Sequence, residues 1–93
     1  MLEKDIEGYL VQEVIKLEGK CYKFVSPGNA GVPDRIVLLP GGLIGFVECK
    51  APGKKARKLQ VNTIEKLRAL GFIVECVDSK EKVKDFLYKV MLQ

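Results

Sequence analysis

Three polar side chains occupy positions that a simple hairpin of strands does not require. The segment from Gly31 to Lys50 consists of two apolar strands joined by the turn Pro40-Gly41-Gly42. If this turn is a three-residue loop, Asp34 faces Glu48 across the strand pair, and Lys50 lies on the same face two residues further on. A two-residue loop would shift the register by one and place the two carboxylates on opposite faces.

Two carboxylates that face each other across a strand pair repel, and a hard divalent cation between their oxygens removes that cost. Mg²⁺ is commonly bound by one or two carboxylates, completed by water and substrate phosphate. The hairpin therefore predicts a metal site at Asp34 and Glu48, with Lys50 beside it. The alternative is an ordinary hairpin in which Asp34 starts a strand and Glu48 and Lys50 are exposed neighbours.

The charge of the chain favours an anionic partner. The formal net charge is +4 and the pI is about 9.0. A cluster of five basic residues without an acid lies directly after the hairpin, at Lys50, Lys54, Lys55, Arg57 and Lys58. A helix that begins within this cluster would combine free N–H groups with cations and could hold phosphates. A solubilising charge cluster is the alternative.

The chain contains no histidine, so any catalysis must rest on carboxylates, lysine or water. The three cysteines have no C-x-x-C spacing, which argues against a zinc site and is typical of a reducing interior. The charged first residues, from Met1 to Asp5, do not resemble a secretory leader, and no apolar run could span a bilayer. We therefore expect a cytoplasmic protein without a membrane partner.

The apolar periodicity predicts the order α-β-β-β-α-β-α. We expect helices at residues 4–18, 54–70 and 79–91, and strands at 20–26, 35–39, 43–50 and 72–77. Gly19 and Gly71 should end the first two helices, and Asp78 with Glu81 fits a capping box for the third. Because the second helix connects the last two strands, these strands are expected to be parallel in a mixed sheet. The length fits one domain, residues 1–93.

Two further segments are candidates for the site. In the first helix, Glu7 lies beside the apolar stripe, and a solvated carboxylate is the alternative interpretation. The loop of residues 27–31 is rich in turn formers and directly precedes the hairpin, so that a phosphate backbone could approach it closely. The candidate DNA contacts in and around this loop are Ser26, Gly28, Asn29 and Arg35.

The order of these residues resembles the VRR-NUC branch of the PD-(D/E)xK nucleases, in its small stand-alone form. The resemblance is carried by Ile6-Glu7-Gly8-Tyr9-Leu10-Val11, Gly31-Val32-Pro33-Asp34-Arg35, Glu48-Cys49-Lys50, Leu59-Gln60 and Leu67-x-x-Leu70-Gly71. It implies a restriction-endonuclease-like α/β core with a mixed sheet flanked by helices. In the site it implies Asp34, Glu48 and the Cys49 carbonyl as metal ligands. An acid from the first helix would support the metal, either Glu7 or, one turn earlier, Glu3, and Gln60 would touch the phosphate or a water.

The predicted function is a metal-dependent DNA endonuclease that uses Mg²⁺ or Mn²⁺. The resemblance implies a structure-selective enzyme, acting on Holliday-junction-like or branched DNA as a homodimer, with a phage or mobile-element origin. One alternative is a DNA-binding module without catalysis that uses the basic cluster. Another is a flap or single-strand nuclease of the same superfamily.

Overall fold

The computed structural model describes all residues from Met1 to Gln93 and has the predicted order of elements. In chain order these are α1 (Glu3–Lys16), β1 (Lys20–Lys23), β2 (Arg35–Leu39), β3 (Leu43–Cys49), α2 (Lys58–Ala69), β4 (Ile73–Val77) and α3 (Lys80–Met91). None of the helices is long and apolar enough to cross a membrane.

The sheet has the strand order β1-β2-β3-β4 and is mixed, as expected. β1, β2 and β3 are antiparallel neighbours, whereas β4 runs parallel to β3. In the β2–β3 hairpin, Leu39 pairs with Leu43 and Arg35 with Val47, which confirms the register predicted from a three-residue loop. Gly41 and Gly42 both adopt positive φ in this loop, a conformation that glycine adopts without strain.

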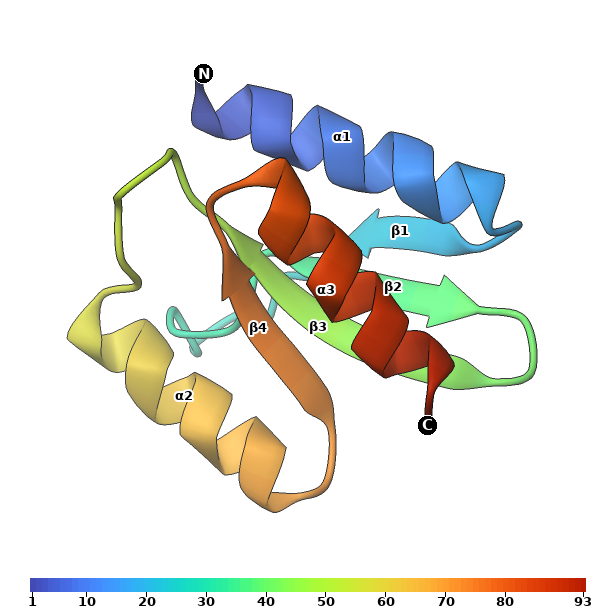
Figure 1. Cartoon of the computed structure of the whole chain (residues 1–93). Coiled ribbons are helices and arrows are strands. Elements are labelled where there is room, and N and C mark those ends of the chain that lie inside the picture. Colours follow the sequence, from blue (N-terminus) through green and yellow to red (C-terminus); the bar gives the residue numbers. More distant parts are fainter.

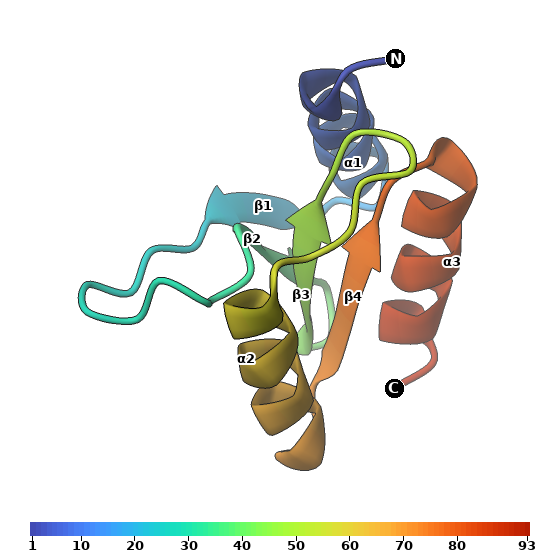
Figure 2. The same ribbon diagram turned by 90° about the vertical axis from the view of Figure 1, so that its left-hand side faces the viewer.

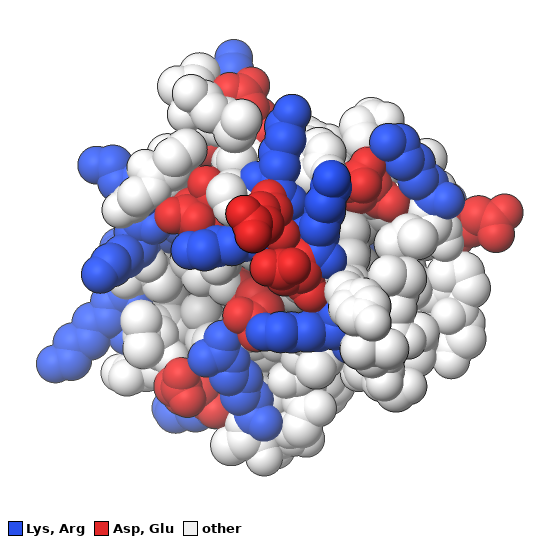
Figure 3. Space-filling model, in the orientation of Figure 1, with Lys and Arg blue, Asp and Glu red and all other residues white.

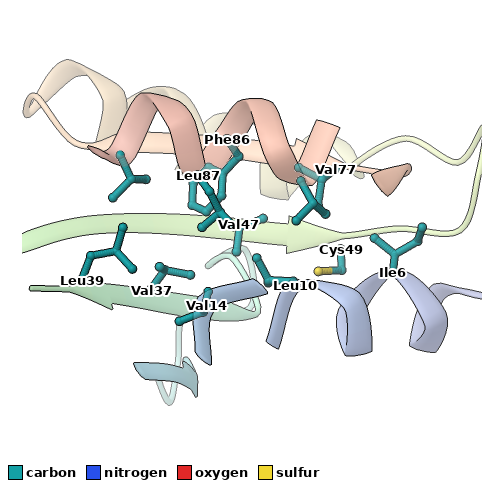
Figure 4. Packing of buried hydrophobic residues seen from close by; sticks show 12 residues of the cluster. Ile6, Leu10, Val14, Val37, Leu39, Val47, Cys49, Val77, Phe86 and Leu87 are labelled. Atoms are coloured by element: carbon teal, nitrogen blue, oxygen red, sulfur yellow. The ribbon is translucent and has the colours of Figure 1, made fainter. Parts of the chain in front are cut away.

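The two faces of the sheet are covered unequally. α1 and α3 lie together on one face, and α2 lies on the other, where it packs along β4 (Figure 1; Figure 2). Side chains from α1, α3 and the strands interdigitate on the first face to form the main core (Figure 4). α3 sits close to β3 at Gly45, where an added Cβ would lie 2.5 Å from Val90 Cγ2 and 2.7 Å from Phe86 Cζ.

A smaller core lies beneath α2. Phe46, Ile64 and Val74 form its centre. The ring of Phe46 packs between Phe24 and Phe72, with centroids 5.4 and 5.5 Å away. This cluster fixes α2 against the face of the sheet that also carries the Glu48 side chain.

The second helix begins four residues later than expected, at Lys58 instead of Lys54. After the turn at Gly53, which has positive φ, the chain stays irregular up to Arg57. The Gln60 side chain then accepts a hydrogen bond from the Arg57 N–H and so stabilises the start of the helix. The prediction of a basic first helical turn was therefore wrong for Lys54 and Lys55, which lie in the preceding loop.

The spacing of the apolar residues predicts that Leu59, Ile64, Leu67 and Leu70 form the buried stripe of this helix, but the buried face of α2 is different. Leu59 is 53% exposed and Leu70 is 73% exposed, whereas Gln60 is buried. Ile64 and Leu67 pack against the sheet as predicted. The helix thus turns the polar side chain of Gln60 towards the sheet, where it contacts Glu48.

Three smaller boundaries differ from expectation. α1 ends at Lys16, and the positive-φ residue that follows is Glu18, not Gly19. Gly19 serves close packing instead, because its Cβ would lie 2.5 Å from the Leu38 carbonyl oxygen. β1 ends at Lys23, although the Phe24 N–H still donates to the Asp34 carbonyl at 2.8 Å. The N-cap of α3 is Ser79, whose hydroxyl accepts from the Lys82 N–H, not Asp78.

Candidate active site

The chemically competent side chains gather where β2 begins and β3 ends. Asp34 directly precedes β2, and Glu48 lies near the end of β3. The Asp34 N–H donates a hydrogen bond to Glu48 Oε1 at 3.0 Å, so the two residues face each other across the hairpin. Lys50 follows β3 directly, and its Nζ lies 3.2 Å from Glu48 Oε2. The hairpin thus brings together the three residues that its spacing singled out.

Glu48 is a buried carboxylate, only 5% exposed, and it is held from several sides. One oxygen accepts from the Asp34 backbone, and the other accepts from Gln60 Nε2 at 2.9 Å and pairs with Lys50. A buried carboxylate needs such partners because an unpaired buried charge is strongly unfavourable. These contacts fix the orientation of the carboxylate before any ligand arrives.

The Asp34 carboxylate has fewer hydrogen-bond partners than the Glu48 carboxylate. Its carboxylate accepts only from the Cys49 N–H, at 3.3 and 3.4 Å. Burial, followed by the nearby charge of Glu48, raises the pKa of Asp34 to about 7, and the Cys49 hydrogen bond opposes this increase only in part. In the metal-free protein, Asp34 therefore titrates near neutral pH, with no cation in contact with it.

Gln60 connects the site to the start of α2. Its amide nitrogen donates to Glu48, and its amide oxygen accepts from the Arg57 N–H at 3.0 Å. Sequence analysis expected Gln60 to touch a phosphate or a water. In the structure both halves of the amide are already engaged, one with the carboxylate and one with the helix terminus. This double contact explains why a polar residue takes a buried position on α2.

Glu7 projects from α1 towards the same end of the sheet, but it is paired with Arg35. Arg35 Nε donates to Glu7 Oε2 at 2.9 Å, and Arg35 NH1 donates to the Cys21 carbonyl at 3.3 Å. No three Asp, Glu, Cys or His side chains are grouped as a ready metal centre. Glu3, the alternative helix acid, is exposed. Of the acids considered, the structure brings Asp34 and Glu48 into contact and leaves Glu7 in an ion pair.

Cys49 contributes its backbone to the site. Its N–H is used by Asp34, and its thiol is fully buried in the main core. Burial, followed by the charge of Asp34, raises the pKa of the Cys49 thiol. The thiol therefore stays neutral. The group of Cys49 that the resemblance implies as a metal ligand is its backbone carbonyl, not its thiol.

The basic cluster lies in the irregular segment that joins β3 to α2, residues 50–57, which we call the basic loop, and continues into Lys58, the first residue of α2. Lys54, Lys55, Arg57 and Lys58 are all exposed. Upstream of them, the Gly53 N–H donates to Asp78 Oδ2 at 3.0 Å, and Asp78 Oδ1 pairs with Lys82 at 3.1 Å. The hydrogen bond from Lys82, then that from Gly53, lowers the pKa of Asp78. Asp78 thus ties the basic loop to the end of β4, a role that sequence analysis missed.

The loop between β1 and β2 projects from the sheet on the side of α2 (Figure 2). Asn29 Nδ2 donates to Ser26 Oγ at 3.0 Å, and Gly28 has positive φ. At the base of the loop, Gly31 packs against α2, where an added Cβ would lie 2.7 Å from the Leu59 carbonyl oxygen. Ser26, Gly28 and Asn29 therefore stand together beside the hairpin, whereas the Arg35 side chain is only 14% exposed.

The face formed by α1 and α3 carries charges of both signs. On the face formed by α1 and α3, acidic and basic side chains are interspersed, and acidic groups gather near its centre between lysines (Figure 3). Along the chain, the run of basic residues without an acid lies at positions 50–58.

A mixed sheet flanked by helices, with Asp34, Glu48 and Lys50 at one end of its hairpin, defines a restriction-endonuclease-like core of the PD-(D/E)xK type. No protein-family model matches the chain. The chain is 54% identical over 79 residues to "Putative nuclease p44" of Acyrthosiphon pisum secondary endosymbiont phage 1, covering 85% of each sequence.

A solved structure described as a VRR_NUC domain superposes with a TM-score of 0.85 at 31% identity, covering 92% of this chain and 94% of the other. The chain therefore belongs to the VRR-NUC family, in its phage type.

Proposed function

We propose that the protein is a metal-dependent DNA endonuclease that hydrolyses phosphodiester bonds. The observation that carries this proposal is the contact of Asp34, Glu48 and Lys50 at one end of the hairpin. Membership of the VRR-NUC family and similarity to a phage protein named as a nuclease support it. An ordinary hairpin would not need to bury one of two facing carboxylates.

The donor set fits a hard divalent cation. Asp34 and Glu48 supply two carboxylates, and burial, followed by the charge of Glu48, raises the pKa of Asp34, whose own carboxylate has no cationic side chain in contact with it. Mg²⁺ is suited to such a site because it needs few protein ligands and retains water. We therefore assign Asp34, Glu48 and the Cys49 carbonyl as ligands of Mg²⁺ or Mn²⁺. A bound cation would polarise the scissile phosphate and acidify a water molecule.

The other residues of the site act on orientation and charge. Lys50 is on the carboxylate face, where it could orient the attacking water or stabilise negative charge on the phosphate in the transition state. Gln60 holds Glu48 in position through its amide nitrogen. The exposed basic loop, together with Ser26, Gly28 and Asn29, would bind the phosphate backbone.

We further propose that the substrate is branched DNA and that the protein acts as a homodimer. No aromatic platform or base-reading element stands out, so recognition would rest on the backbone and on shape. On the α2 side of the sheet, the half formed by β1 and β2 has no helix over it (Figure 2). Tyr22 of β1, which pairs with Ile36, is 54% exposed. A second copy could cover this surface, and two sites related by a two-fold axis would suit paired cuts in a four-way junction.

The test is cleavage of labelled four-way junction, flap and plain duplex DNA, each with Mg²⁺, with Mn²⁺ and with EDTA. The enzymes are the wild type, Lys50→Ala and, as a matched control of the same residue type, Lys66→Ala on the exposed side of α2. We expect cutting that needs the metal, disappears in Lys50→Ala and persists in Lys66→Ala. Binding of all three DNAs without cleavage would instead identify a non-catalytic binding module.

A further inference from the structure

The loop between β1 and β2 carries an apolar side chain that the fold does not bury. Val25 is 76% exposed, a larger fraction than for any other large exposed apolar residue of the chain. Pro27, two residues later, is exposed as well. Single exposed apolar residues are common on protein surfaces. Val25 differs from them because its loop is held in place and lies beside the candidate active site.

Both ends of the loop are anchored. At the first end, the ring of Phe24 packs against Phe46, with 5.4 Å between the centroids. At the second end, Gly31 is buried against α2, where an added Cβ would lie 2.6 Å from Thr63 Oγ1. The loop therefore cannot fold back over the sheet without breaking one of these contacts.

The tip of the loop is braced by its own hydrogen bonds. Asn29 Nδ2 donates to Ser26 Oγ at 3.0 Å, and the Asn29 N–H donates to the Ser26 carbonyl at 2.9 Å. The Val25 side chain is branched at Cβ, which restricts rotation about χ1. A braced loop with a stiff side chain loses little conformational entropy when a ligand contacts it.

Val25 is also close to the carboxylates of the site. The Phe24 N–H donates to the Asp34 carbonyl at 2.8 Å, and the loop projects on the side of the sheet that carries Glu48 (Figure 2). The Cα atoms of a hydrogen-bonded pair lie about 5.5 Å apart, and consecutive Cα atoms about 3.8 Å, so the Val25 Cα lies within roughly 9 Å of the Asp34 Cα. Because nucleotides of one strand are spaced by about 3.4 Å, bases within about three nucleotides of the cut are in reach of Val25.

An apolar side chain at this place favours one kind of DNA. Such a side chain can insert between base steps, which unstacks them in part and kinks the duplex. Unstacking costs least where pairing or stacking is already interrupted. A branch point interrupts the stacking, whereas plain duplex does not. Insertion beside the site therefore selects branched DNA without reading its sequence.

We propose that Val25 inserts against the bases at a branch point and thereby determines the preference of the enzyme for branched over plain duplex DNA. The proposal rests on the proposed function and names the residue on which its structure selectivity depends. It requires neither an aromatic platform nor a base-specific contact.

The experiment follows the fluorescence of 2-aminopurine, which rises when this base loses its stacked neighbours. The probe is placed at the branch point of a four-way junction and at the same sequence position of a plain duplex. Each DNA is titrated with the full-length protein in EDTA, so that nothing is cut. The variants are Val25→Ala, Val25→Leu and, as the matched control, Val61→Ala at another exposed valine, on α2.

We expect the wild type to raise the fluorescence of the junction and not that of the duplex. Val25→Ala should lose this rise and bind the junction about tenfold more weakly, which is the effect of two buried methyl groups, with a smaller loss on the duplex. Val25→Leu keeps an apolar side chain and should retain the rise, as should Val61→Ala. Circular dichroism verifies the fold of each variant.

The proposal is overturned if the wild type binds the junction without raising the fluorescence, or if Val25→Ala raises it as the wild type does. It is overturned as well if the wild type binds neither DNA. Failure of the proposed function gives a different result, in which the wild type raises the fluorescence in EDTA but cuts no DNA with Mg²⁺ or Mn²⁺.

Discussion

At the level of single residues, Asp34 is the carboxyl group of the site whose negative charge is least stabilised by its surroundings. Glu48 is surrounded by three donors, whereas Asp34 has one long hydrogen bond and a buried, like-charged neighbour. Such a pair is poorly arranged for the metal-free protein and well arranged for a cation. Ionisation of Asp34 therefore lowers the stability of the folded protein.

The first prediction follows from the raised pKa of Asp34. The folded protein holds this proton up to about pH 7, whereas the unfolded chain loses it near the usual value of 3.8. Between these values the folded state binds more protons, so stability falls as pH rises. In EDTA, Asp34→Asn should remove this loss, and its melting temperature should increasingly exceed that of the wild type from pH 4 to pH 8.

The control for this prediction is Asp85→Asn, an exposed carboxyl on α3. The difference in melting temperature between Asp85→Asn and the wild type should be the same at every pH from 4 to 8. Added Mn²⁺ at pH 8 should stabilise the wild type and not Asp34→Asn, because a ligand that binds only the folded state raises its stability. An Asp34→Asn protein that is less stable than the wild type by the same amount at every pH would contradict the interpretation.

The second prediction concerns Gln60. Gln60→Ala removes one of the donors that orient Glu48 and one acceptor at the start of α2. By analogy with residues that orient metal ligands, we expect kcat for DNA cleavage to fall by about 10–100-fold. Stability should fall by about 1–2 kcal/mol because a buried hydrogen-bond partner is lost. Asn62→Ala, two residues away and exposed, is the control, and equal effects of both substitutions would exclude a role in the site.

At the level of elements, the hairpin was the most predictable part of the chain. Its alternation of side chains and its three-residue turn determine which residues face each other, so Asp34 and Glu48 could be placed from the sequence. The parallel pairing of β3 and β4 was also expected, because parallel strands need a long crossover connection and the helix between them supplies one. The pattern of apolar residues is sufficient to predict pairing between strands that follow one another in the sequence.

The start of α2 could not be predicted in the same way. Lys54 and Lys55 have no local feature that excludes a helix. The segment is held in another conformation by a contact with Asp78, 25 residues away from Gly53. The inward position of Gln60 likewise depends on Glu48. Both features belong to tertiary contacts, which the spacing of apolar residues does not encode.

The third prediction tests this tether. Asp78→Ala removes the acceptor for the Gly53 N–H and should loosen the basic loop. Limited trypsin digestion should then cut faster after Lys54, Lys55 and Arg57, because mobile exposed loops are the preferred sites of proteolysis. Asp78→Asn keeps an acceptor without the charge and should be cut more slowly than Asp78→Ala. Identical digestion of all three proteins would show that the loop does not depend on the tether.

At the level of the whole molecule, the charged side chains are distributed unevenly. The side of α1 and α3 carries mixed charges (Figure 3), whereas the exposed basic residues follow the end of β3, directly after Glu48 and Lys50. The net charge of +4 favours a negatively charged partner, but it does not show how the charges are distributed over the surface. Nor did the sequence reveal the Glu7–Arg35 pair, whose members are 28 residues apart.

The fourth prediction is that the basic loop dominates the salt dependence of DNA binding. Each phosphate neutralised by a cation contributes about −0.9 to the slope of log K against log salt for duplex DNA. If Lys54 and Lys55 each contact one phosphate, the double variant Lys54→Gln/Lys55→Gln should have a slope smaller by about 1.8 in magnitude. The measurement is fluorescence anisotropy with labelled junction and duplex DNA at several salt concentrations, in EDTA to prevent cleavage.

The matched control is Lys66→Gln/Lys84→Gln, which removes the same charge from exposed positions on α2 and α3. If only net charge mattered, both double variants would lose affinity equally, because long-range attraction depends on the total. If the loop makes direct phosphate contacts, the slope changes only in the loop variant. A slope that is the same in the loop variant and in the wild type would mean that the cations beside the site do not touch DNA, and the binding surface would have to lie elsewhere on the sheet.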